Sequence, residues 1–301
     1  MVCSLGPMLS NVVKSVRIGV VGFGSVGKYL TGHILSDHGR AAGLELAFVW
    51  DITPDHIREA DPSIREYQLV DINDFSCKGA DMIIEVAHPS ITRDYGTKFL
   101  SCTDYLAGSP TCFADAAVEA AIRKQVANSG YSLYLPAGAL WGANDIQKMA
   151  SQNSISNMTI TMKKNSHHLK VLGNLKTALD KIVANDLPGE HVLYEGPVGP
   201  LCPLAPNNVN TMACAAMAGG LGFHNTKARL VVDRSLDAHV VEVDIEGPDG
   251  FIVKSSRYNP AKEGAVTGNA TYASFLNSLL AATGITRGRM HSGTRGDVHI
   301  L

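Results

Sequence analysis

The feature that most constrains the fold is a glycine-rich turn near the start of the chain. It follows an apolar run at residues 16–21 and opens a stretch, residues 27–35, in which apolar side chains recur at helical spacing. In such a turn the first glycine allows a tight bend, the second lets the backbone approach a pyrophosphate, and the third lets the helix pack closely on the strand. The helix N-terminus then offers free N–H groups to the phosphates. The pattern predicts a dinucleotide site formed by Gly22, Phe23, Gly24, Ser25, Val26 and Gly27.

An acidic residue follows where such a site needs one. Asp51 comes directly after a second apolar run, residues 44–50, near the expected spacing of about 20 residues beyond the glycines. A carboxylate in this place accepts hydrogen bonds from the ribose hydroxyls and repels a 2′-phosphate. We therefore predict NAD as the cofactor, with NADP still possible because Arg58 lies nearby in the sequence.

Strands and helices alternate through the first half of the chain. Apolar runs at residues 82–86, 104–107 and 132–136 are typical of buried strands, and residues 116–128 are typical of a helix. Such alternation predicts an α/β fold, a doubly wound parallel sheet of the Rossmann type, over residues 16–150.

The second half has a different pattern. Apolar and polar side chains alternate over residues 156–163, the runs at 228–233 and 239–246 also favour strands, and residues 210–218 favour a buried helix. This pattern predicts a second, α+β domain of mainly antiparallel sheet over residues 151–270.

Three further segments complete the predicted organisation. Residues 1–15 are expected to form a flexible leader, and residues 271–285 a closing helix that packs back on the Rossmann domain. Residues 286–301 contain Arg, Gly, His and Ser without periodicity, so we expect a mobile tail there.

The composition narrows the function classes. The chain has 301 residues and a net charge of −2, which gives no overall field that attracts nucleic acid or a membrane surface. No apolar run reaches the length of a membrane span, and the six cysteines form no CxxC pair. We expect a cytoplasmic protein with a small-molecule substrate and with no nucleic-acid partner, membrane contact or metal site.

Small and polar residues follow the predicted strands where a nicotinamide would lie. Ala87 and His88 come after the run at residues 82–86, and residues 108–110 and 136–139 hold equivalent places. Loops after the carboxyl ends of the strands face the cofactor in a Rossmann sheet. We therefore predict that Ala87 and His88 contact the cofactor.

Together with the glycine turn, five segments of the chain resemble the L-aspartate dehydrogenase family. They span residues 85–90, 135–140, 194–196, 206–210 and 237–242, and the resemblance extends over about residues 16–285. It implies a homodimeric, NAD(P)-dependent amino-acid dehydrogenase. Such an enzyme converts L-aspartate via iminosuccinate to oxaloacetate and ammonia, or catalyses the reverse reaction.

The resemblance also implies roles for single residues. Ala139 and Asn210 match cofactor contacts of the family, with Asn208 as the near alternative to Asn210, and His239 matches the catalytic histidine. The family has a basic residue followed by proline where this chain has Lys164 and Asn165. The carboxylate-binding part of the site therefore departs from the family pattern.

The chemistry of amine oxidation adds candidates for substrate binding. Hydride transfer from an amino acid needs an acceptor for the amine proton and cations or N–H donors for the carboxylates. Histidine suits the first role because its ordinary pKa is about 6.5. Lys163 and Lys164, at the end of a predicted strand, and Asn210 are candidates for the second.

Two other functions stay open at this point. One is a related two-domain oxidoreductase acting on homoserine or a sugar, although sugar enzymes of this type carry a Glu-Lys-Pro segment where residues 107–110 here have no lysine. The other is a non-enzymatic sensor that binds NAD(H) without turnover.

Overall fold

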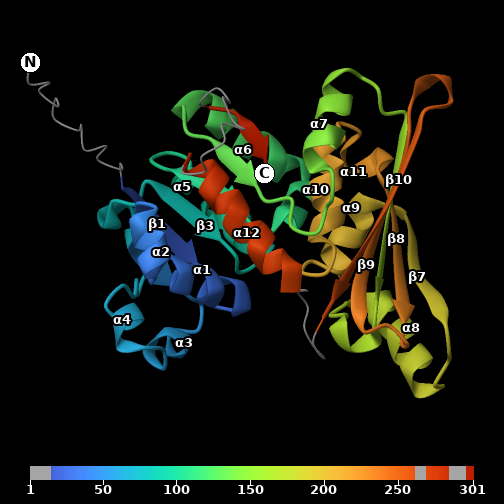
Figure 1. The fold of residues 1–301 in the computed structure, drawn as a ribbon, viewed down its shortest axis with the longest axis horizontal. Coiled ribbons are helices and arrows are strands. Elements are labelled where there is room, and N and C mark those ends of the chain that lie inside the picture. The colour runs from blue at the N-terminus through green and yellow to red at the C-terminus, as the bar shows by residue number, and fades with distance from the viewer. Residues whose placement is uncertain (1–14, 262–268, 285–295) are drawn as a thin grey trace, which may run out of the picture.

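The computed structural model describes residues 15–261, 269–284 and 296–301. They form two sheets, each with helices packed against it, and the long helix α12 (Asn269–Ala282) runs between the two parts (Figure 1). The predicted flexible leader, apart from Ser15, lies outside the described residues. Within the described part of the chain, no helix is long and apolar enough to cross a membrane.

The first sheet has six strands in the order β11-β5-β4-β3-β1-β2, and all of its strand pairs are parallel. The strands are short apolar runs, as expected for a sheet covered on both faces. Their bounds are β1 (Val16–Val21), β2 (Leu44–Trp50), β3 (Met82–Glu85), β4 (Asp104–Ala107), β5 (Leu133–Leu135) and β11 (Val298–Ile300).

Alternate side chains of these strands enter two separate cores. Ile84 and Leu106 pack with residues of α1 and α12, whereas Ile83 and Tyr105 pack with residues of α5 and α6 on the other face. The predicted doubly wound sheet is confirmed. Its helices are α1 (Ser25–Leu35), α2 (Asp37–Ala41), α3 (Asp55–Arg58), α4 (Pro62–Arg65), α5 (Pro89–Phe99) and α6 (Ala116–Ser129), with 3-10 helices at Ile72–Lys78 and Pro110–Ala114.

The second sheet has five strands in the order β10-β9-β6-β8-β7. Only the central pair β6 and β8 is parallel, and the other three pairs are antiparallel. The predicted second domain of mainly antiparallel sheet is therefore confirmed. The bounds are β6 (Asn157–Lys164), β7 (Glu190–Pro197), β8 (Lys227–Asp233), β9 (Ala238–Glu246) and β10 (Ile252–Pro260).

Helix α10 supplies the core beneath this sheet. Seven of its nine residues are buried, in keeping with its run of Ala, Met and Cys. It packs on α7, α9 and α11 (Figure 1). The helices of this half are α7 (Ala143–Ser151), α8 (Gly173–Ala184), α9 (Val198–Leu201), α10 (Asn210–Ala218) and α11 (Gly222–Asn225), with 3-10 helices at Ser166–His168, Cys202–Leu204 and Pro248–Gly250.

The end of the chain returns to the first domain. Helix α12 packs against α1, and its Leu279 is fully buried in the core beneath the first sheet. The prediction of a mobile tail is wrong for the last residues, because β11 pairs in parallel with β5 and Ile300 is buried. A strand of three residues is too short to show a recognisable alternation of apolar and polar side chains in the sequence. Residues 285–295 lie outside the described part.

Candidate active site

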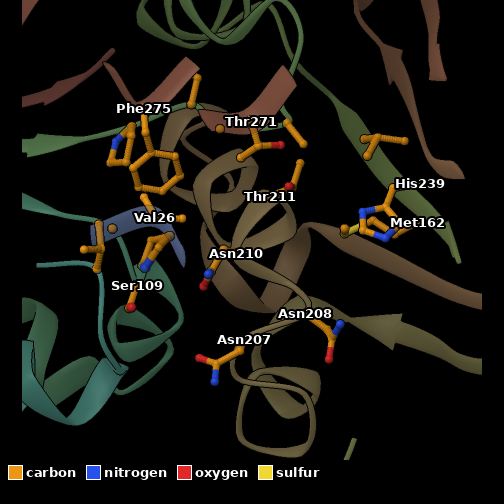
Figure 2. A pocket seen from close by; sticks show the side chains of 18 of the residues that line it. Val26, Ser109, Met162, Asn207, Asn208, Asn210, Thr211, His239, Thr271 and Phe275 are labelled. Carbon is orange, nitrogen blue, oxygen red and sulfur yellow. The ribbon is translucent and has the colours of Figure 1, made fainter. Parts of the chain in front are cut away.

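A cavity of about 370 Å³ lies between the two sheets and is walled by both domains. In Figure 2, Val26, Ser109 and Phe275 lie on one side of it. Met162 and His239 lie on the other, with Asn210 and Thr211 between them. The volume is in the range of sites for small ligands. The loops after β1, β3, β4 and β5 all reach it, as the carboxyl ends of parallel strands do in this fold.

The glycine turn has the geometry of a phosphate cradle. Gly22 has a φ of +107°, and a Cβ there would lie 2.8 Å from the nitrogen of Ala87. A Cβ on Gly27 would lie 1.9 Å from the oxygen of Gly22, so this glycine is needed for close packing of helix on strand. A Cβ on Gly24 would meet nothing within 4 Å, and Gly24 precedes α1 without a side-chain cap. Open space before uncapped N–H groups fits a pyrophosphate.

Of the six predicted residues of the turn, three line the cavity and three support it. Gly24, Ser25 and Val26 line it, whereas Gly22 and Gly27 shape the backbone behind them. Phe23 is buried in the core between the sheet and α1, so its side chain does not face the cavity.

Asp51 is bound to the glycine turn itself. Its Oδ2 accepts the N–H of Phe23 at 2.7 Å, and its Oδ1 accepts the N–H of Thr53 at 2.8 Å and lies 3.2 Å from Nδ1 of His56. Asp51 does not line the cavity, since it lies at the end of β2. It therefore fixes the turn, and its side chain is 11% exposed.

A cross-strand row forms the wall of the cavity in the second domain. The register that pairs Lys163 with Val240 places Lys164 of β6 beside His239 of β9, and His239 pairs with Asn259 of β10. Lys164, His239 and Asn259 all line the cavity. Two residues further along the strands, Met162, Val241 and Arg257 form the next row, on the same face because side chains alternate.

The two predicted lysines point to opposite faces of β6. Lys164 is 4% exposed, and burial lowers its pKa to about 8. Lys163 does not line the cavity, and its Nζ pairs with Glu190 at 2.8 Å and Glu242 at 3.3 Å. The structure thus brings Lys164 to the cavity and engages Lys163 elsewhere.

His239 is held at the start of β9 with its ring inside the wall. It is 6% exposed, and the ring of His168 packs edge-on against it, with centroids 4.8 Å apart and planes at 75°. His168 is itself buried, in the segment after β6. These contacts fix the orientation of the imidazole toward the cavity.

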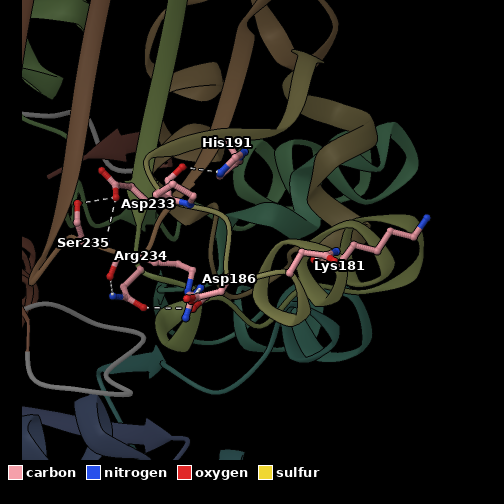
Figure 3. Close-up of polar contacts among 10 residues, drawn as sticks. Lys181, Asp186, His191, Asp233, Arg234 and Ser235 are labelled. Atoms are coloured by element: carbon pink, nitrogen blue, oxygen red, sulfur yellow. Dashed lines mark hydrogen bonds and ion pairs between the residues drawn. The ribbon is translucent and has the colours of Figure 1, made fainter.

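The turn that leads to His239 is anchored from two sides (Figure 3). Asp233 accepts hydrogen bonds from the N–H and hydroxyl of Ser235, and Arg234 pairs with Asp186. The amide of Asn165 donates to the carbonyls of Arg234 and Leu236 at 2.8 and 3.1 Å. The asparagine where the family has proline therefore positions the strand that carries the histidine.

The two predicted asparagines differ in their hydrogen bonding. Asn208 accepts the N–H of Lys170 at 2.7 Å and donates to the carbonyl of His168 at 2.9 Å, so its amide joins two segments of backbone. Asn210, at the start of α10, has an Oδ1 that is buried without a hydrogen-bond partner among the described residues. Both line the cavity, but Asn210 has an acceptor to offer a ligand.

The predicted cofactor contacts in the loops of the first domain also differ, because some line the cavity and one does not. Ala87 and Ala139 line the cavity. His88 does not, because its Nδ1 accepts the N–H of Ser90 and caps α5. The loop at residues 136–139 is held from behind by the end of the chain, since the N–H of Ala137 donates to the carbonyl of Leu301 at 2.5 Å.

Sequence reasoning missed several residues of the cavity. Arg257 lies on β10, which was not predicted, and its Nη1 donates to the carbonyl of Gly138 at 3.3 Å. Burial lowers the pKa of Arg257. Phe275 comes from α12, far along the chain. The missed lining residues also include Lys170, Asn207, Thr211, Asn259 and Thr271.

The charges on the cavity wall are all of one sign. Its lining residues in the described part include Lys164, Lys170 and Arg257 beside His239, and no aspartate or glutamate. No group of three or more metal-ligating side chains gathers within the described ranges. Cations in the wall of a cavity suit an anionic ligand.

Models of two known protein families match the two domains of the chain separately. A family model described as "Aspartate dehydrogenase, C-terminal" matches residues 145–278, and one described as "Homoserine dehydrogenase, NAD binding domain" matches residues 22–136. The crystal structure of aspartate dehydrogenase from Thermotoga maritima has a TM-score of 0.68 at 19% identity and covers 92% of this chain and 99% of its own. The shared fold and the predicted nicotinamide cofactor are confirmed.

Sequence relatives extend the match over most of the chain. Aspartate dehydrogenase domain-containing proteins of Danio rerio and Xenopus tropicalis are 45% and 47% identical over 90% of this chain and 96% of their own. The L-aspartate dehydrogenase of Methanococcoides burtonii is 26% identical over 88% of this chain. The predicted family and the predicted oxidoreductase are confirmed. This chain belongs to the aspartate dehydrogenase family.

Proposed function

We propose that the chain oxidises L-aspartate with NAD, or NADP, to iminosuccinate, which water converts to oxaloacetate and ammonia, and that it can run the reverse reaction. The observation that carries this proposal is the arrangement of the cavity. One end is the glycine cradle at Gly24, and the other is the basic wall of Lys164, His239 and Arg257.

The basic wall fits a dicarboxylate better than a neutral substrate. Homoserine has one carboxylate and sugars have none, whereas aspartate has two to place against Lys164 and Arg257. Lys170, which is exposed, stands where it can attract the substrate from solvent. A charge-assisted hydrogen bond to each carboxylate would also offset the cost of burying these cations.

His239 is the proposed acid–base residue. When bound, a nicotinamide supplies the hydride acceptor for the substrate Cα. His239 takes a proton from the amine as the imine forms, and then orients the water that attacks the imine carbon. Met162, Val241 and Phe275 keep the surrounding wall apolar. This limits the entry of water molecules other than the one that attacks the imine.

The cofactor is held by the first domain and the asparagines. The N–H groups at the start of α1 would bind the pyrophosphate, Asp51 the adenosine ribose, and Asn210 the carboxamide through its unsatisfied oxygen. Ala87 and Ala139 leave room for the ring. The carboxylate of Asp51 favours NAD over NADP.

The homodimer that the family resemblance implies belongs to the same proposal. Strand β10 is an edge strand, and its side chains Ile252 and Tyr258, with Phe251 before it, are between 49% and 59% exposed. An apolar edge of this kind is typically covered by another chain. Light scattering after size exclusion should give twice the chain mass, and a monomer at micromolar concentration would contradict it. The cytoplasmic location stays a prediction.

A steady-state assay tests the activity. NADH formation should follow L-aspartate at alkaline pH and should be much slower with homoserine or D-aspartate. Turnover of homoserine in preference to aspartate would favour the related-dehydrogenase alternative. Binding of NADH without turnover of any of these substrates would favour the sensor.

A further inference from the structure

One acidic side chain lies directly behind the lining of the cavity. Glu85 is the last residue of β3 and is fully buried. Its carboxylate contacts Ala87 and Ser109, and both of these residues line the cavity on the side of the first domain. Glu85 is thus one residue layer away from the space where a nicotinamide would lie.

The hydrogen bonds of Glu85 join two loops. Its Oε1 accepts the N–H of Ala87 at 2.7 Å, in the loop after β3. In the loop after β4, Ser109 donates its N–H to Oε2 and its hydroxyl to Oε1, both at 3.0 Å. Each of these partners donates, so the ionised carboxylate matches them all, whereas a protonated acid would have to turn one O–H toward a donor.

The negative charge of this carboxylate is opposite in sign to the charges that line the cavity. The side chains lining the cavity supply three cations and no acid in the described part of the chain. An oxidised nicotinamide ring carries one positive charge and a reduced ring carries none. Cations alone would disfavour the oxidised ring, and Glu85 is a negative charge on the side where the ring would lie.

We propose that Glu85 is a positioning residue whose ionised carboxylate holds the loops after β3 and β4 together and favours the oxidised over the reduced cofactor. The inference rests on the proposed function only in that the cavity must bind a nicotinamide. It does not depend on which substrate is oxidised.

The ionisation of Glu85 couples this preference to pH. Burial raises its pKa to about 7, and the hydrogen bonds from Ala87 and Ser109 only partly oppose that rise. The titratable groups that face it are Tyr105 and Cys112, whose own pKa values are raised by burial and by Glu85, so both are neutral near pH 7. Near this pH, a cation bound beside Glu85 would release its proton.

Across the cavity, the lining supplies three basic side chains, Lys164, Lys170 and His239. Burial lowers the pKa of Lys164 to about 8, so its protonation can also change when a cation binds. A substitution at Glu85 separates its contribution from theirs, because it leaves all three in place.

Calorimetric titration of the protein with NAD+ and with NADH tests the inference. Measurements at pH 7 in phosphate and in Tris give the number of protons released. The unmodified protein should release more protons with NAD+ than with NADH. Glu85→Gln should reduce that difference to the contribution of Lys164 and weaken NAD+ relative to NADH roughly 10–100-fold, as expected for a unit charge about 6–12 Å away at an effective dielectric constant of about 20.

Two further variants complete the experiment. Ser109→Ala keeps the carboxylate but removes one donor, so the pH of greatest proton release should rise. It provides the test if Glu85→Gln does not fold. Glu45→Gln, an exposed carboxylate on β2 of the same sheet, is the matched control and should behave as the unmodified protein.

The outcomes are distinct. An unchanged ratio of NAD+ to NADH affinity in Glu85→Gln, or an unshifted proton-release profile in Ser109→Ala, would overturn the inference while leaving the proposed dehydrogenase intact. Normal cofactor behaviour without oxidation of aspartate would remove the proposed function and leave the inference standing. Binding of neither nucleotide would overturn both.

Discussion

Lys164 and His239 stand side by side on the adjacent strands β6 and β9, both buried in the wall of one cavity. Two basic side chains so placed repel each other when both are charged, and burial adds to the cost. An anion between them would relieve both effects. The pair is therefore a reason to expect that ligand binding and protonation are linked in this site.

Replacing Lys164 by Met should raise the free energy of unfolding at pH 7 while weakening the binding of aspartate. The pKa of Lys164 is lowered from 10.5 to about 8 by burial. Below pH 8 the folded state carries the full penalty of a buried ammonium. Between pH 8 and 10.5 only the unfolded state binds the proton, so the contribution of Lys164 to the free energy of unfolding rises with pH. Urea denaturation should give a gain on the order of 1–3 kcal/mol at pH 7, shrinking by pH 10. A gain that grows with pH would contradict this.

Replacing His239 by Ala should slow aspartate oxidation by about 10²–10⁴-fold, the usual worth of a positioned acid–base group. NADH binding should persist, because the cofactor is held mainly by the first domain. His239→Asn should also be slow, since it cannot transfer the proton. The control is His224→Ala, an exposed residue of α11. If that control is inactive and His239→Ala is not, the wrong histidine has been chosen.

Three glycines of α1 and its preceding turn should respond differently to valine. Gly24→Val should keep its melting temperature and lose NADH affinity, because the added side chain enters open space where the pyrophosphate would lie. Gly32→Val also enters open space but on the exposed side of α1, so it should bind NADH normally. Gly27→Val should fail to fold, since its Cβ would lie 1.9 Å from the oxygen of Gly22. Unchanged NADH affinity in Gly24→Val, by calorimetry, would mean that the turn is no cradle.

Replacing Asp51 by Ser should weaken NAD and relax discrimination against NADP. The shorter side chain removes the charge that repels a 2′-phosphate and also the hydrogen bond to the N–H of Phe23. Asp51→Asn separates the two effects, because it keeps an acceptor oxygen without the charge. Kinetics with both cofactors provide the measurement. Equal use of NADP and NAD by the unmodified protein would show that Asp51 sets no preference.

Replacing Arg257 by Met should raise the KM for aspartate by roughly 10–100-fold, the value of a charge-assisted hydrogen bond of about 1.5–3 kcal/mol. The turnover number should change less, because Arg257 would bind the substrate before and during the reaction alike. Arg229→Met on β8 is the matched control, since Arg229 lies outside the cavity and faces Glu195. A fall in turnover number of the size expected for KM, with KM itself unchanged, would assign Arg257 a different role.

The first domain could be predicted well because its signals are local. In the turn after β1, Gly22 and Gly27 are required by close backbone contacts and Gly24 leaves open space, and buried strands such as β2 are mostly apolar. Strands β7 and β10 were missed because they are edge strands. Their residues alternate between half-buried and exposed, and so lack a core face that stands out in the sequence.

The cavity residues that could be predicted belong to a motif or follow a predicted strand, as Ala87 and Lys164 do. His239 and Asn210 came from the family resemblance, and Gly24 from the fingerprint. Arg257 and Phe275 come from elements whose contact with the cavity depends on the packing of distant segments, which no local pattern reveals. Lys163 and Lys164 were indistinguishable as neighbours in sequence. Only the register of β6 against β9 decides which one faces inward.

The return of β11 to the first sheet makes that domain discontinuous, and this has a consequence for biosynthesis. Residues 16–135 leave the ribosome before residues 298–301, so the edge of β5 stays open and the N–H of Ala137 unbonded until residues 298–301 have emerged. The cofactor loop is therefore completed only after the second domain has been synthesised. An N-terminal fragment would expose a strand edge prone to pairing with other chains.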